Sequence, residues 1–176
     1  MREDSCPRPI SPYGVTKLAG EHLCRLYHTS FGLATLILRY FTVYGPRQRP
    51  DMAIHRFIKA IRDGKAIPVY GDGGQSRDFT YVHDVVAATV LAMQSDTAGT
   101  VFNVGGGSRV TINQTIGLLA RIMGQEALVE YQRAELGDVR DTLSDTSRAQ
   151  RVLCFAPQVS FEDGVKAEVA WALAQS

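Results

Sequence analysis

The chain has 176 residues, 45% of them hydrophobic and 21% charged, which fits one compact domain or one lobe of a larger one. Its formal net charge of +1 gives no reason to expect a nucleic-acid or membrane partner, and no apolar run approaches the length of a transmembrane helix. Residues 1–10 do not resemble a signal peptide. The cysteines show neither metal-ligand spacing nor a secreted disulfide pattern. We therefore expect a reduced, cytoplasmic protein without a metal site.

The first third of the chain predicts a helix, a strand and a second helix. Ser11 and Pro12 are typical of an N-cap and a first helical residue, so a helix is expected over about 13–28. The nearly continuous apolar run over 34–40 is typical of a strand buried on both faces. After a basic loop, a second helix is expected over 53–62.

The rest of the chain continues to alternate between strands and helices. The expected strands cover about 68–70, 77–82, 100–104 and 128–131. The expected helices cover about 84–93, 112–123, a short segment after Asp145, and 161–173. Thr111 and Gln114 have the spacing of a capping box. The alternation predicts an α/β fold.

Tyr13 and Lys17 are the first candidates for chemistry. They lie four positions apart on a predicted helix and therefore share one of its faces. An ammonium beside a phenol favours the phenolate and lowers the phenol pKa, which suits a general base that acts on a hydroxyl. The alternative is an ordinary polar pair on a helix surface, because this spacing alone has low specificity.

Five ordered segments resemble the NAD-dependent epimerase/dehydratase family of extended short-chain dehydrogenases. They are SPYGVTKLAGE at 11–21, LRYFTVYGP at 38–46, RDFTYVHDV at 77–85, FNVGGG at 102–107 and GDVR at 137–140. Their order and spacing make the resemblance far more specific than the Tyr-Lys pair. The region from Arg39 to Met52 is most similar to epimerases that act on UDP-glucose or UDP-glucuronate.

The resemblance implies the C-terminal portion of a Rossmann-type doubly wound α/β fold, with a small α/β substrate-binding lobe. Residues 1–50 would end the Rossmann-type domain. Residues 51–176 would be mostly the lobe, with a strand near 100–104 that returns to the sheet. Family members are nearly twice as long, and their glycine-rich dinucleotide unit would lie upstream. We therefore expect a truncated form that exposes its first helix and strand and associates through them, as a homo-oligomer or with the missing half.

The resemblance also implies roles for residues near the cofactor, NAD. Tyr13 would be the catalytic base and acid, and Lys17 would bind the nicotinamide ribose and tune Tyr13. Tyr40 and Val43 would contact the cofactor, Val43 through its backbone. The serine or threonine that pairs with the tyrosine in relatives would lie upstream of the chain.

Five further residues would bind the UDP-sugar substrate. Thr42 stands where relatives commonly have an asparagine that binds the diphosphate. Arg77 matches an arginine that grips the diphosphate, although a solvated arginine at a strand edge is the alternative. Asn103 would lie near the nucleotide. Asp138 and Arg140 belong to a loop that reaches the nucleotide ribose or phosphate in relatives.

Two other segments allow more than one interpretation. Arg47, Gln48 and Arg49 form either a flap over an anionic substrate or a solvated loop. Gly105 to Gly107 lack the spacing of a phosphate-binding loop, so a strand-to-loop turn is expected.

The function that the resemblance implies is 4-epimerisation of a UDP-sugar through a keto intermediate, in the intact enzyme. A dehydratase, decarboxylase or reductase of the same family is one alternative. A non-catalytic nucleotide-diphosphate-binding module, or a structural remnant, is another. We do not expect these residues alone to be catalytic, because the half that binds the cofactor is missing from them.

Overall fold

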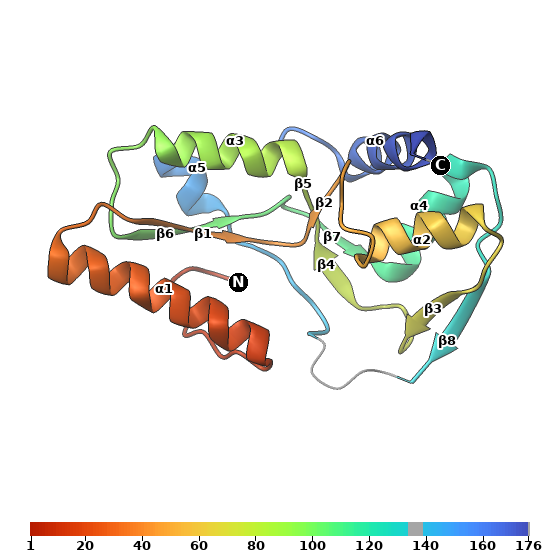
Figure 1. Cartoon of the computed structure of the whole chain (residues 1–176), viewed down its shortest axis with the longest axis horizontal. Coiled ribbons are helices and arrows are strands. Elements are labelled where there is room, and N and C mark those ends of the chain that lie inside the picture. The colour runs from red at the N-terminus through yellow and green to blue at the C-terminus, as the bar shows by residue number, and fades with distance from the viewer. Residues whose placement is uncertain (134–138, 176) are drawn as a thin grey trace.

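The computed structural model describes residues 1–133 and 139–175, and it is an elongated α/β molecule with two groups of elements (Figure 1). The first group contains α1 (Pro12–Phe31), β1 (Leu36–Tyr40), α3 (Val82–Met93), β6 (Thr100–Val104) and α5 (Ser147–Leu153). The second contains α2 (Ala53–Arg62), β3 (Ile67–Tyr70), β4 (Ser76–Asp78), β7 (Arg109–Thr111), α4 (Ile112–Met123), β8 (Val129–Gln132) and α6 (Phe161–Ala174). Strands β2 (Val43–Tyr44) and β5 (Thr80–Tyr81) pair in parallel between the two groups. The predicted α/β class is confirmed.

The long helix α1 begins and ends where its capping residues predict. The Ser11 hydroxyl accepts the Gly14 N–H at 3.1 Å, and Gly32 closes the helix with a left-handed φ of 67°. None of the helix residues is buried. The helix is fastened to β1 by a bidentate pair in which Arg39 Nε and Nη2 lie 2.9 and 2.8 Å from the Glu21 carboxylate oxygens. Burial opposes ionisation of Glu21, but Arg39 and Arg25 together lower its pKa below the ordinary value.

Strand β1 pairs in parallel with β6, in a register that sets Leu38 beside Phe102. Leu36 and Leu38 pack against the core formed with α3 and α5. The expectation that β1 is buried on both faces is wrong, because Leu36 to Arg39 are only half-buried and Tyr40 is exposed. Helix α1 also contacts β1, and it buries none of its own residues. The expected exposure is thus observed for the first helix, whereas the strand is half-buried except at Tyr40.

The second group packs α2, α4 and α6 around a separate hydrophobic core. Its members include Tyr44 of β2 and buried residues of strand β3 and of the three helices: Ile54, Ile67, Val69, Leu119 and Val165. Strand β3 pairs with β8 in parallel, and β4 pairs with β7 in antiparallel fashion. Within the described ranges, no helix has the length and apolar character needed to cross a membrane.

The strand expected over 77–82 is divided into β4 and β5, which pair with different partners. Arg77 of β4 lies opposite Val110 of β7, whereas Thr80 of β5 lies opposite Val43 of β2. Phe79, between them, is buried in the core. A break of one residue is enough to redirect the chain from one sheet to the other, and local alternation does not reveal it.

Candidate functional site

Tyr13 and Lys17 lie on the first turns of α1, at the end of the helix that is directed toward the second group of elements (Figure 1). The Lys17 Nζ atom lies 5.1 Å from the centroid of the Tyr13 ring. The Tyr13 side chain is 71% exposed, so its phenol is accessible from outside the chain. The structure therefore brings the two residues together on one face, as the four-residue spacing predicts.

Tyr40 is the last residue of β1, and Thr42 and Val43 follow it, so all three lie at the carboxyl end of a parallel strand, where α/β sheets commonly bind ligands. The Tyr40 hydroxyl lies 2.9 Å from Thr89 Oγ1 on α3. The Thr42 carbonyl accepts the Thr80 N–H at 2.9 Å, which fixes the crossing from β1 to β2. Val43 is half-buried in β2.

The basic loop after β2 is anchored by its glutamine. Gln48 Nε2 donates to the Val43 carbonyl at 3.2 Å, and Gln48 Oε1 accepts the His55 N–H at the start of α2 at 3.1 Å. Arg49 pairs with Asp51 at 2.9 Å, and both side chains are exposed. Arg47 is also notable, because it adopts a left-handed φ of 69°.

Arg77 and Arg140 come together from segments that are far apart in the sequence. Arg77 Nη1 donates to the Arg140 carbonyl at 3.2 Å, and the Ser76 N–H donates to the same carbonyl at 2.9 Å. The exposed Arg140 guanidinium pairs with Asp72 at 3.3 Å. The pKa of Asp72 is lowered first by the Gly74 N–H and then by the Arg140 charge. Two guanidinium groups on adjoining backbone suit a diphosphate. Asp138 lies outside the described residues.

Asp78 organises this site, and the sequence interpretation gave it no role. It is fully buried beside Arg77, and its Oδ1 accepts the N–H groups of Gly106 and Gly107 at 2.9 and 3.1 Å. Its Oδ2 accepts the Ser144 N–H at 2.8 Å and the Ser144 hydroxyl at 2.5 Å. Asp78 therefore ties β4 to the segment that follows Arg140. The sequence feature that could have indicated this role is an acidic residue within a short strand, because a buried carboxylate needs hydrogen-bond donors.

The glycine turn after β6 serves this buried carboxylate. A Cβ atom on Gly106 would lie 2.0 Å from the Phe79 carbonyl oxygen, and one on Gly105 would lie 1.9 Å from Ser144 Oγ. Since Asp78 occupies the N–H groups of Gly106 and Gly107, they are not free to bind phosphate. The turn permits close packing, as expected for a strand-to-loop turn.

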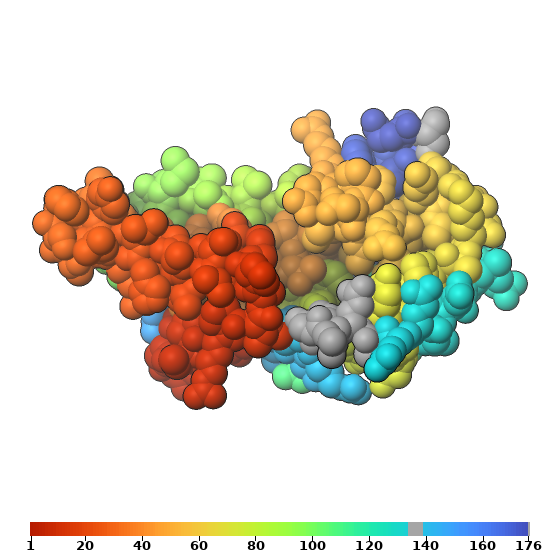
Figure 2. Space-filling model, turned by 60° about the horizontal axis from the view of Figure 1, so that its bottom comes forward, coloured from red at the N-terminus to blue at the C-terminus, as the bar shows by residue number. Residues whose placement is uncertain are grey.

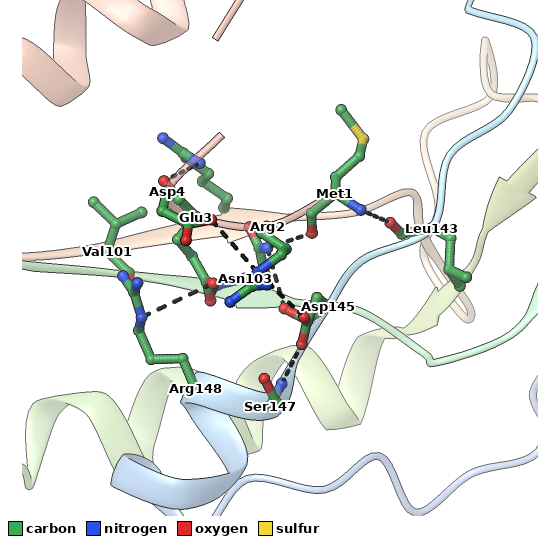
Figure 3. A network of polar contacts seen from close by, with 11 residues as sticks. Met1, Arg2, Glu3, Asp4, Val101, Asn103, Leu143, Asp145, Ser147 and Arg148 are labelled. Atoms are coloured by element: carbon green, nitrogen blue, oxygen red, sulfur yellow. Dashed lines mark hydrogen bonds and ion pairs between the residues drawn. The ribbon is translucent and has the colours of Figure 1, made fainter. Parts of the chain in front are cut away.

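Asn103, predicted to lie near the nucleotide, is only 1% exposed and faces the backbone of two other segments. Its Nδ2 donates to the Met1 carbonyl at 3.0 Å and to the Asp145 carbonyl at 3.2 Å. Its backbone N–H donates to Glu3 Oε1 at 3.0 Å, and Figure 3 shows Arg148 on the other side of Glu3. In this arrangement Asn103 joins the N-terminal residues and the segment after Arg140 to the edge of β6.

Comparisons with known proteins identify relatives that are similar to this chain in sequence and in structure. The profile described as "NAD dependent epimerase/dehydratase family" matches residues 1–105. A UDP-glucuronate 4-epimerase of Thermodesulfobacterium geofontis is 43% identical over 93% of this chain and 50% of its own. An uncharacterized UDP-glucose epimerase of Bacillus subtilis is 43% identical over 97% of this chain and 54% of its own.

The structural comparison agrees with the sequence comparison. The crystal structure of a UDP-glucuronic acid 4-epimerase from Bacillus cereus, in complex with UDP-glucuronic acid and NAD, matches with a TM-score of 0.96 and 45% identity. The match covers 99% of this chain and 56% of that one. The chain thus spans about half the length of the relatives it matches. The matched profile and these relatives show that the chain belongs to the NAD-dependent epimerase/dehydratase family.

Proposed function

We propose that this chain supplies the tyrosine helix and the nucleotide-sugar lobe of an NAD-dependent UDP-sugar 4-epimerase. The observation that carries the proposal is the hydrogen bond from the Arg77 guanidinium to the Arg140 carbonyl. The Asp78 carboxylate supports this contact, because it binds Ser144 in the segment that follows Arg140. Two of the relatives, at 43% and 45% identity, are UDP-glucuronate 4-epimerases, and one of them is solved with UDP-glucuronic acid and NAD. UDP-glucuronate is accordingly the substrate to test first.

Tyr13 carries the proton chemistry in this proposal. As a phenolate it takes the proton from the sugar hydroxyl. It returns that proton to the keto sugar after the sugar has rotated to present its other face. Lys17, whose ammonium lies beside the Tyr13 ring, binds the nicotinamide ribose. Bound NAD would supply the hydride acceptor and donor for the sugar carbon, next to Tyr13 and Lys17.

The described residues fit one end of the cofactor. Tyr13 and Lys17 are on an accessible face, and Val43 stands at the carboxyl end of β1, so these residues would hold the nicotinamide and its ribose. The glycine turn after β6 does not provide a pyrophosphate site, because Asp78 binds its N–H groups. We infer that turnover requires a dinucleotide-binding half besides this chain.

The outer surface of the first group is where such a half would pack. Along α1 the exposed apolar side chains include Tyr13, Val15, Leu23, Leu26, Tyr27 and Phe31. In Figure 2 this helix projects along one side of the molecule. Apolar surface of this kind promotes association, so we propose that the chain pairs with the missing half or, without it, with another copy.

Thr42 and Asn103 have different parts in the proposal. The Thr42 hydroxyl contacts the diphosphate side of the sugar nucleotide. Asn103 acts indirectly, since its amide holds the backbone at Asp145 and thereby the segment that follows Arg140.

Titrations of the purified chain with UDP and with NAD test the proposal. The lobe is expected to bind UDP, and Arg77→Gln and Arg140→Gln should each weaken binding by about tenfold or more, because each loses a charge-assisted contact. Arg121→Gln is the matched control, since Arg121 is an exposed arginine on α4 that pairs with Glu162. If the chain bound neither UDP nor NAD, the result would favour the alternative of a structural remnant. UDP binding unaffected by both arginine changes would reject the assigned site.

A further inference from the structure

Helix α6 carries a carboxylate that the mechanism above does not use. Glu168 is completely buried. Its Oε2 accepts the backbone N–H of Gly45 at 2.7 Å, a bond that joins residues 123 positions apart. Among residues 1–133 and 139–175, its Oε1 finds no hydrogen-bond partner. Buried polar atoms are normally satisfied, so this arrangement requires an explanation.

The surroundings of Glu168 hold it firmly against β2. The Tyr44 ring packs against Phe79, Tyr81 and Phe161, with ring centroids 5.2 to 5.9 Å apart. The Tyr44 hydroxyl donates to the Phe161 carbonyl at 3.3 Å, at the start of α6. A Cβ atom on Gly164 would lie 2.2 Å from that hydroxyl. The first turns of α6 therefore sit directly on the residue before Gly45.

Gly45 is the point at which the backbone turns away from β2. Its φ of 128° is a conformation that side chains rarely allow, and a Cβ atom would lie 2.9 Å from both Tyr81 and Val82. Val43 lies two residues before it, and the basic residues Arg47 and Arg49 follow. Gly45 therefore lies between the predicted nicotinamide contact and the basic loop.

Keeping a carboxylate at this position is unfavourable for the fold. Burial raises the pKa of Glu168 to about 7, only partly offset by the Gly45 N–H. An uncharged residue of similar shape would avoid that penalty. Charged groups that persist at a stability cost are commonly retained for function.

We propose that Glu168 is a positioning residue: in its ionised form it holds the Gly45 amide, and with it the loop from Val43 to Arg49, and on protonation it loosens that loop. The role of the loop in cofactor and substrate contact rests on the proposed function. The hydrogen bond itself does not.

Few other charges face this buried site. Tyr44 and Tyr81 approach it from β2 and β5, and burial together with the Glu168 charge raises the pKa of Tyr44 well above its ordinary value. Asp84 of α3 and Asp163 of α6 act on the same phenol. From α2, the His55 ring lies 5.9 Å from Trp171 of α6, and Arg121 of α4 pairs with Glu162. In the described part of the chain, no arginine or lysine pairs with Glu168.

Nuclear magnetic resonance of the Gly45 amide in the full chain provides the test. Between pH 5 and 8, ionisation of Glu168 should move the amide proton signal with a midpoint near 7. For local opening of the loop, in which Glu168 stays buried on α6, ionisation should also raise protection of this amide from hydrogen exchange about tenfold, after correction for intrinsic exchange, since a bond to a charged acceptor is the stronger kind. In Glu168→Gln both responses should disappear and protection should stay at its low-pH level. Glu162→Gln, an exposed carboxylate on the same helix, should behave like the unmodified chain.

Two results would overturn the proposal. One is a Gly45 signal in the unmodified chain that does not titrate near pH 7. The other is an unchanged titration in Glu168→Gln. Protection at Ile58 and Leu119 in the same core reports whether the variant is folded. Because the measurement needs neither UDP nor NAD, its outcome is independent of the proposed activity.

Discussion

Replacement of Glu168 by glutamine should reveal how the stability of the chain depends on pH. In the unfolded chain this carboxyl has its ordinary pKa of 4.5, whereas in the folded chain the pKa is raised to about 7 by burial. Between these values the folded state binds a proton that the unfolded state has released. Stability from this group is therefore complete below pH 4.5 and is lost as the pH rises through 7.

The expected magnitude follows from the size of the pKa difference. A difference of about 2.5 pKa units, at about 1.4 kcal/mol each, corresponds to about 3–4 kcal/mol over the full titration. Urea unfolding, followed by far-ultraviolet circular dichroism from pH 5 to 8, measures this quantity. The free energy of unfolding of the unmodified chain should fall by up to about 3 kcal/mol relative to that of Glu168→Gln.

A matched control separates this effect from general charge loss. Hydrogen bonding and charge interactions with Lys166 lower the pKa of the exposed Glu162, so Glu162→Gln should run parallel to the unmodified chain between pH 5 and 8. Parallel stability curves for the unmodified chain and Glu168→Gln would refute the reasoning, because they would show that Glu168 does not titrate in this range in the folded state.

Three further substitutions test other parts of the structure. Arg39→Gln should cost about 1–3 kcal/mol by breaking the bidentate pair that fastens α1, and its effect should shrink as Glu21 protonates below pH 4.5, as chemical denaturation would show. Asp78→Asn should lower stability by about 3 kcal/mol or more and weaken UDP binding in calorimetry, whereas unchanged binding would argue against its positioning role. Gly106→Ala should lower the melting temperature by several degrees, because its Cβ would lie 2.0 Å from the Phe79 carbonyl oxygen.

Local signals in the sequence predicted the helices well. Helix α2 has the predicted bounds, and the capping box of Thr111 and Gln114 has both of its hydrogen bonds at the start of α4. Ser11 and Gly32 fix the ends of α1. These features depend on residues within a few positions of one another, which is why they can be found without knowledge of the fold.

Features that depend on distant partners were missed. The division of one expected strand into β4 and β5 follows from pairing with β7 and β2, and β7 itself is too short to show a pattern. The exposure of β1 depends on what covers its second face. Asn103 and the Asp78 side chain form hydrogen bonds with segments that lie 28 to 102 residues away in the sequence. Motif resemblance located Arg77 and Arg140, but only the fold places them together.

The central claim is that Tyr13 carries the proton chemistry of a UDP-sugar epimerase. The direct measurement joins this chain to the dinucleotide-binding half of the Thermodesulfobacterium geofontis UDP-glucuronate 4-epimerase and follows conversion of UDP-glucuronate to its 4-epimer. We predict turnover that Tyr13→Phe lowers by about 10²–10⁴-fold without weakening UDP binding, whereas Tyr27→Phe, an exposed tyrosine on the same helix, leaves it unchanged. Turnover that survives Tyr13→Phe at the unmodified rate would contradict the account.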